Sequence, residues 1–385
     1  MASFPNQLQC HIRANRQSPI NTLLGYFSGS TITASLPLPP RPTVEEAFAN
    51  WEGERRTLMA QKISDFGLTI AGTRVEKMVE QLYSELAANG LVFRPPVYLS
   101  DQWGCPDGTP LIGVPFYLAD PRLAQIEDDL ALGIESDDDA MRYMRHEAGH
   151  AFNYAYRLYD RADWRKTFGP YSRPYRDRYR ADPFSHDFVR HILGWYAQKH
   201  PDEDFAESFA VWLTPDSDWR NAYSDWPALT KLEYVDRVMR DIGDDPPAAV
   251  EPTEDDLPVS AMSYTIEEHY RDAEDSLPIS DRRVFDGDLR NIFAAESEAP
   301  LAQAAAEFIA GHRREIVARI SYWTGESSYV VKQFIDFLRE RAESLGLHVR
   351  GLEASTLIEL TAFGTAVIMN YRHTNVMDGT EGDEE

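Results

Sequence analysis

The sequence is organised around RHEAGHAF, the stretch at residues 145–152. It places His146 and His150 four residues apart, with Glu147 directly after the first histidine. On a helix, side chains four residues apart lie on one face, so both imidazoles can bind the same metal ion. Glu147 then lies where it can take a proton from a water molecule bound to that metal. A motif this short also arises by chance, so the surrounding sequence has to provide a third ligand.

The segment around the motif has the features of a buried helix. Ser136 is a favourable N-cap residue, and the acids at 137–139 lie where the helix dipole favours negative charge. The predicted helix runs from residue 140 to about residue 159 and carries both histidines. Its inner face is apolar, with Met141, Met144, Ala148, Ala151, Phe152 and Ala155 at helical spacing. We therefore expect the histidines to lie on a helix that is anchored in the core.

A second acidic helix downstream offers the missing ligand. Pro201 suits the first position of a helix, and Glu203 and Glu207 follow one turn apart on a shared face. One of these carboxylates can bind the metal while the other accepts a hydrogen bond from the outer nitrogen of a ligating histidine. Asp202 and Asp204 also fall in the first turn, where we expect them to be solvated acids that complement the helix dipole.

His-Glu-x-x-His followed far downstream by Glu-x-x-x-Glu resembles the pattern of the gluzincin metallopeptidases. Residues 203–209, EDFAESF, are similar to the corresponding helix of the anthrax lethal factor protease domain. Residues 186–215 resemble a bacterial family of zinc-binding metallopeptidases, and the whole likeness covers about residues 91–215. Several members of that family carry a zinc ribbon, which two distant cysteines, Cys10 and Cys105, cannot form.

The resemblance implies one catalytic Zn²⁺ ion and a role for each residue that matches the motif. Glu147 would be the general base and the proton shuttle to the leaving amine. Tyr196, seven residues before Glu203, would donate to the oxyanion; the alternative is a core aromatic residue. Glu207 would orient a ligand from behind, although the reverse order of Glu207 as ligand and Glu203 as first-turn acid remains open. The implied zinc ligands are His146, His150 and Glu203.

The length of 385 residues exceeds what one hydrophobic core usually supports. We expect an α+β fold in which a mostly helical, zincin-like metallopeptidase domain with a small sheet precedes a helical C-terminal module. The expected boundaries are an extended or disordered arm at 1–42, the zincin-like domain at 43–243, an acidic, proline-rich linker at 244–262, the helical module at 263–376 and an acidic tail at 377–385.

Apolar periodicity predicts the other elements. Two extended runs, 91–99 and 111–118, contain prolines that suit edge strands, and they either offer an edge to an extended peptide or form a short hairpin. Helices are expected at 43–62, 74–88, 186–199, 228–241, 301–323, 328–345 and 356–369.

A basic window at residues 157–190 stands out in an acidic chain. It holds nine Lys and Arg against five Asp, a local charge of +4 in a chain of net charge −25. Tyr171, Tyr175 and Tyr179 lie between the basic residues. One interpretation is a recognition loop for an acidic or aromatic substrate segment. The other is that these arginines pair with the surplus carboxylates of the protein itself.

The bulk composition limits the partners. A net charge of −25 argues against nucleic acid and against an anionic membrane surface as the main partner. No apolar run is long enough to cross a bilayer, and no secretory signal is visible at the N-terminus, so we expect a cytoplasmic protein.

The expected function is zinc-dependent hydrolysis of peptide or isopeptide bonds in a protein or peptide substrate. Two alternatives remain open. One is a zinc-stabilised binding or scaffold protein that acts through its C-terminal helices. The other is a zinc amidase that acts on a non-peptide amide, which the motif cannot separate from a peptidase.

Overall fold

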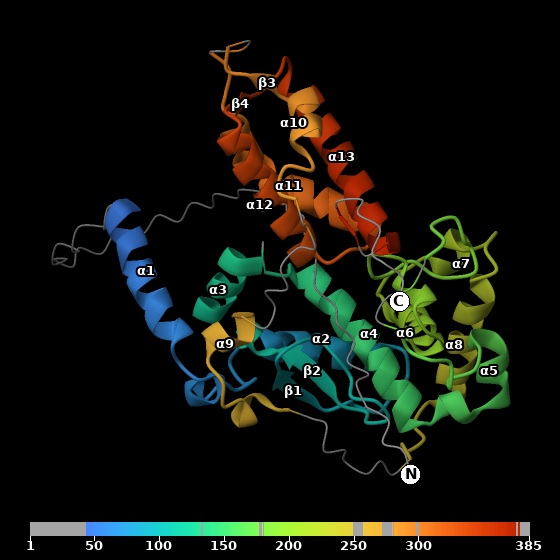
Figure 1. Cartoon of the computed structure of the whole chain (residues 1–385). Coiled ribbons are helices and arrows are strands. Elements are labelled where there is room, and N and C mark those ends of the chain that lie inside the picture. Colours follow the sequence, from blue (N-terminus) through green and yellow to red (C-terminus); the bar gives the residue numbers. More distant parts are fainter. Residues whose placement is uncertain are drawn as a thin grey trace, which may run out of the picture.

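The computed structural model is mostly helical and contains two small two-stranded sheets, which confirms the expected α+β class (Figure 1). The expected arm at 1–42 and most of the acidic tail fall outside the described residues. Residues 249–256 of the expected linker also fall outside them. The structure describes residues 44–131, 134–176, 179, 181–248, 257–271, 279, 281–297, 299, 301–374 and 376–377.

Two helices, α4 (Asp137–Ala155) and α6 (Pro201–Leu213), form the centre of the first part of the chain. Ser136 caps α4, because its hydroxyl accepts a hydrogen bond of 3.1 Å from the backbone N–H of Asp139. The imidazole of His200 caps the first turn of α6, which begins with the predicted proline at its first position. Local sequence therefore fixes where each of these helices starts.

Gly149 allows α4 and α6 to pack closely. A Cβ atom at this position would lie 2.7 Å from the Cα atom of Ala206 and 3.1 Å from the Cβ atom of Phe209. Such distances are too short for any side chain larger than hydrogen. The glycine inside the histidine motif thus brings the two helices together where the histidines face α6.

The expected strands exist, but they do not form a hairpin. β1 (Val97–Ser100) and β2 (Ile112–Pro115) pair in parallel, with Val97 opposite Ile112. A parallel pair needs a crossover, which the turn-rich segment between the strands provides. The two-stranded sheet lies beside α4 and α2 (Arg74–Ala88) in Figure 1, and every residue of β2 is buried. The hairpin interpretation is therefore wrong.

The first hydrophobic core extends beyond the expected linker. Val259, Met262 and Ile266 are buried in it, and Lys62 forms an isolated β-bridge with Thr265. Residues 257–271 thus pack against the first part of the chain. The other helices of this part are α1 (Val44–Met59), α3 (Pro121–Ala131), α5 (Ala162–Phe168), α7 (Trp219–Ala222), α8 (Leu229–Ile242) and α9 (Ile266–Arg271).

A second hydrophobic core lies among the C-terminal helices, drawn in orange to red in Figure 1. A short antiparallel pair, β3 (Ala294–Ala295) with β4 (Leu347–His348), closes the far end of this bundle. The long helices lie close to the predicted ranges. They are α11 (Ala305–Thr324), α12 (Ser328–Ser344) and α13 (Glu353–Thr374), preceded by α10 (Asp286–Ile292).

The two parts touch at a pair of glycines. A Cβ atom on Gly325, at the end of α11, would lie 2.3 Å from the Cα atom of Gly194, and both glycines have positive φ. The Arg372 guanidinium of α13 donates to the carbonyl of Thr324 and lies over the ring of Tyr179, 5.5 Å from its centroid. The C-terminal bundle therefore contacts the loop that precedes α6.

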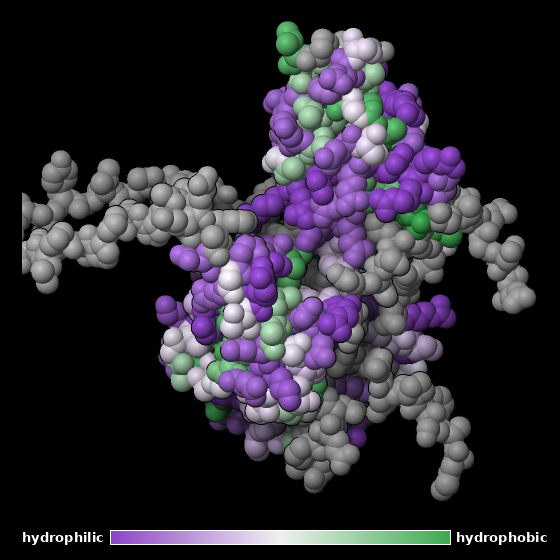
Figure 2. Space-filling view, turned by 60° about the vertical axis from the view of Figure 1, so that its left-hand side comes forward, coloured by the Kyte–Doolittle hydropathy of each residue, from purple (hydrophilic) through white to green (hydrophobic). Residues whose placement is uncertain are grey.

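Figure 2 shows many hydrophilic residues, in purple, with pale and green residues between them on the face it presents. This distribution agrees with the net charge of −25. Within the described part of the chain, no helix has both the length and the apolar character needed to cross a bilayer.

Candidate metal centre

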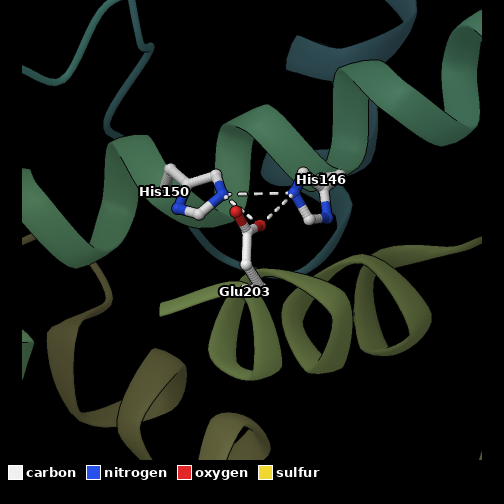
Figure 3. A group of neighbouring side chains, drawn as sticks. All are labelled: His146, His150 and Glu203. Carbon is white, nitrogen blue, oxygen red and sulfur yellow. Dashed lines mark hydrogen bonds and ion pairs between the residues drawn. The ribbon is translucent and has the colours of Figure 1, made fainter. Parts of the chain in front are cut away.

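The two histidines and the first downstream glutamate converge on one point. His146 and His150 project from α4 towards α6, and Glu203 rises from α6 between them (Figure 3). The Oε2 atom of Glu203 lies 3.0 Å from Nε2 of His146 and 3.1 Å from Nε2 of His150. The two Nε2 atoms are 3.1 Å apart, and all three side chains are buried. This group could hold a metal ion, and its donor types are those that zinc prefers.

The outer nitrogen of each imidazole meets a carboxylate. Nδ1 of His146 lies 2.9 Å from Oε1 of Glu207, and Nδ1 of His150 lies 3.0 Å from Oδ2 of Asp202. In neutral rings each Nδ1 donates its proton to that carboxylate, so each Nε2 presents a lone pair towards Glu203. Three acceptor atoms then face one another without a proton between them. A cation at their centre removes this repulsion, so the residues fit a bound metal.

Asp202 and Asp204 are not the solvated acids that the sequence suggested. Asp202 is 2% exposed and also accepts hydrogen bonds of 2.6 Å from Asn153 and from the hydroxyl of Tyr154. Asp204 is 1% exposed and pairs with Lys231 at 2.6 Å. The expectation is wrong because the first turn of α6 lies in the interior, where each acid needs its own donors.

Glu207 is held by backbone donors as well as by His146. Its Oε2 atom accepts hydrogen bonds from the backbone N–H groups of His191, at 3.2 Å, and Ile192, at 2.8 Å. The helix expected at 186–199 is therefore wrong, because these N–H groups point at a carboxylate and Trp195 has a φ of 55°. Only a 3₁₀ turn, Tyr196–Gln198, forms there.

Glu147 differs from Glu207, because no described residue holds its carboxyl group. Its exposed fraction is 0%, and neither carboxyl oxygen has a hydrogen-bond partner among the described residues. Burial raises its pKa from 4.5 to about 7, although the neighbouring imidazoles of His146 and His150 oppose that shift. A buried carboxyl without such a partner is costly, because burial removes the hydration of its charged form.

Tyr175 and Tyr196 lie beside the three converging side chains, and only Tyr196 was predicted from the sequence as a site residue. The Tyr196 ring lies 5.7 Å from the ring of His146, and its hydroxyl lies 3.3 Å from that of Tyr175. Tyr175 itself donates a hydrogen bond of 2.6 Å to Oε1 of Glu203. The tyrosines between the arginines of the basic window were the available signal, but no spacing rule connects Tyr175 with Glu203.

The structure therefore brings together every residue that the sequence singled out for the site: His146, Glu147, His150, Tyr196, Glu203 and Glu207. Comparison with known proteins adds no match: no family model, no curated protein and no solved structure matches this chain.

Proposed function

We propose that this chain is a zinc-dependent hydrolase that cleaves peptide or isopeptide bonds, with a zincin-like domain of the gluzincin type. One observation carries the proposal. Glu203 reaches both histidines from a separate helix, and the buried carboxyl of Glu147 beside them has no partner among the described residues. A zinc site that only stabilises the fold has no use for an unpaired carboxyl next to it.

In this proposal, His146, His150 and Glu203 hold the ion. Glu207 and Asp202 fix the orientation of the two imidazoles through their outer nitrogens. A zinc ion held here supplies Lewis acidity for the attacking water and for the scissile carbonyl.

Glu147 moves the proton in both halves of the reaction. Its carboxylate removes a proton from the water that attacks the carbonyl carbon, and the resulting acid gives that proton to the leaving nitrogen as the C–N bond breaks.

The tyrosines supply hydroxyl donors on the same side as Glu203. Tyr175 holds the outer oxygen of Glu203, so it keeps that carboxylate turned towards the histidines. The hydroxyl of Tyr196, 3.3 Å away from that of Tyr175, is the donor we assign to the carbonyl oxygen as negative charge develops.

A second candidate function is a zinc-stabilised binding protein that acts through its C-terminal helices. Exposed apolar side chains on that bundle favour it: Tyr322 is 49% exposed, Trp323 59% and Ile358 69%. The two candidates differ in what they require of Glu147, because a binding protein needs only the ligands of the metal.

The experiment compares the full chain with its Glu147→Gln variant. We expect the variant to lose at least about a thousandfold in the rate of zinc-dependent cleavage of protein substrates, because it has no base. Zinc content and melting temperature should stay the same, since Glu147 makes no hydrogen bond with a described residue. Full activity in the variant, or zinc-loaded wild-type protein that cleaves neither peptides nor other amides, would contradict the proposal. Cleavage confined to non-peptide amides would identify an amidase.

A further inference from the structure

We propose that Lys199 binds a carboxylate of the substrate, so that the site takes peptides with an acidic side chain or a free C-terminus beside the scissile bond. The inference rests on the proposed function and names its substrate class. It starts from a buried cation that the proposed chemistry does not use.

Lys199 is 6% exposed and lies in the turn that leads into α6, four residues before Glu203. Its ammonium lies 4.3 Å from the ring centroid of Tyr175 and 5.1 Å from that of Tyr196. Its one hydrogen bond to a described residue, at 3.4 Å, goes to the hydroxyl of Tyr196. No described carboxylate lies within ion-pairing distance, so most of its donor capacity is left for another acceptor.

A second buried lysine, Lys231, has the ion pair that is expected of a cation with a structural role. Lys231 is 9% exposed, and its ammonium forms an ion pair of 2.6 Å with Asp204 and a hydrogen bond to the backbone carbonyl of Asp187. Without such partners a buried ammonium destabilises the fold, because no interaction offsets the free energy lost when it leaves water. Lys199 has no equivalent of Asp204 among the described residues, which points to a partner that arrives with the substrate.

Lys199 also lies close enough to the proposed metal ligands to contact a bound substrate. The Tyr196 hydroxyl that it contacts is 3.3 Å from the Tyr175 hydroxyl, which in turn bonds Glu203. The ammonium is thus separated from a metal-facing carboxylate by two tyrosine hydroxyls. A carboxylate bound at Lys199 would therefore belong to a residue close to the bond that is cut.

The charges of the basic window at residues 157–190 also favour an acidic substrate. At its beginning, Arg157 pairs with Asp160 at 2.8 Å and Arg161 with Asp163 at 3.0 Å, as the self-pairing interpretation expects. Nearer to Tyr175, Arg173 is exposed and forms no ion pair with any described residue. Arg173 therefore adds a positive charge without an internal ion pair close to Tyr175 in the chain, where it would attract an acidic peptide.

The test measures binding to the zinc-loaded full chain carrying Glu147→Gln, which prevents turnover during the titration. Four fluorescent peptides of the same length combine acidic or glutamine side chains with a free or an amidated C-terminus, and anisotropy gives each dissociation constant. Lys199→Met, Lys199→Arg and the exposed control Lys77→Met, which lies outside the basic window, are made in the same background. The melting temperature of each variant reports whether it folds.

We expect Lys199→Met to weaken binding of a carboxylate-bearing peptide at least about tenfold and to leave the all-amide peptide within about twofold. Lys199→Arg should restore most of the affinity, and Lys77→Met should leave every dissociation constant unchanged. Loss confined to acidic side chains assigns Lys199 to an internal acidic residue, and loss confined to free termini assigns it to the C-terminal carboxylate.

The inference is overturned if Lys199→Met weakens the binding of all four peptides equally. It is also overturned if the parent protein binds carboxylate-bearing and all-amide peptides with the same affinity. The proposed function fails separately. If the protein with Glu147 intact prefers carboxylate-bearing peptides but cuts none of them, the binding role of Lys199 stands and the hydrolase does not. If it cuts all four peptides equally well, the hydrolase stands and the inference does not.

Discussion

At the residue scale, each imidazole of the centre uses both of its nitrogens. One nitrogen faces Glu203, and the other is held by a carboxylate that is itself fixed by further donors. Asp202 accepts from Asn153 and Tyr154, and Glu207 accepts from two backbone N–H groups. The orientation of the rings thus depends on residues that never touch the metal position.

Asp202→Asn tests this dependence. The amide has the shape of the carboxylate but no charge. Its NH₂ group can also point at Nδ1 of His150, where two donors would face each other. We expect the affinity for zinc to fall about 10–100-fold, measured by competition with a chelator. Asp225→Asn, an exposed position, is the matched control and should leave the affinity unchanged. Equal zinc affinities in Asp202→Asn and the wild-type protein would show that Asp202 does not orient His150.

A second residue-scale prediction concerns pH. Burial lowers the pKa of His191 from 6.5 to about 4, and its Nε2 atom lies 3.0 Å from the carbonyl of Arg142. Between these two values the unfolded chain binds a proton that the folded chain does not, so this residue costs stability as the pH falls from about 6.5 to 4. At pH 5 the cost is about 1–2 kcal/mol, reduced because part of the ring is in solvent.

His191→Gln removes that titration and keeps a side-chain amide that can donate to the same carbonyl. We expect its melting temperature to fall less than that of the wild-type protein between pH 7 and pH 5. The measurement is thermal unfolding of both proteins at the two pH values. An identical fall for both would mean that His191 does not resist protonation in the folded state.

The residues of the site differ in how far they could be predicted from the sequence. His146, Glu147 and His150 follow from one local motif, and Glu203 follows from the chemistry that such a motif requires. Tyr175 could not be identified as a partner of Glu203 because their contact depends on the path of a loop 28 residues upstream. Burial of Asp202 was missed for a related reason, since helix position alone does not show which end of α6 is inside.

At the element scale, the metal group exists only because α4 and α6 lie close together. The contact is set by Gly149, which leaves 2.7 Å between a hypothetical Cβ atom and the backbone of Ala206. Glycine is a poor helix former. Its destabilising effect inside α4 is offset by the close helix contact that it permits.

Gly149→Ala should therefore separate the helices. We expect a destabilisation of about 1–3 kcal/mol and a loss of at least about tenfold in zinc affinity, as overpacking moves the histidines away from Glu203. Thermal unfolding and zinc competition measure the two effects. Gly311→Ala, in α11 with no atom within 4 Å of the new Cβ, is the control and should stabilise slightly. A Gly149→Ala protein that is more stable and binds zinc normally would refute this view of the helix pair.

Elements with regular apolar spacing were predicted well, whereas those determined by tertiary contacts were not. α2 begins and ends at the predicted residues because a cap, a regular apolar face and a terminal Asn-Gly all agree. Segment 186–199 has apolar residues at helical spacing, yet Glu207 captures its backbone donors and Gly194 turns the chain. The parallel pairing of β1 and β2 likewise depends on the crossover between them rather than on either strand.

At the scale of the whole molecule, the two parts that contain the hydrophobic cores touch at the loop that carries Tyr196. The contact of Gly194 with Gly325 and that of Arg372 with Tyr179 connect the C-terminal bundle to the loop that carries Tyr196. The sequence predicted a helical C-terminal module but not this contact, which joins positions far apart in the chain. The bundle thus supports the loop on which the tyrosine hydroxyl and the Lys199 ammonium are placed.

The most direct test of the account is the zinc content of the full chain after dialysis, compared between wild type, Glu203→Ala and an exposed control, Glu340→Ala. Because three buried donors from two helices could hold one ion, we predict one zinc per chain in wild type and control. Glu203→Ala should retain far less than one zinc under the same conditions. One zinc per chain in Glu203→Ala, or none in the folded wild-type protein, would contradict the central claim that His146, His150 and Glu203 together form a metal site.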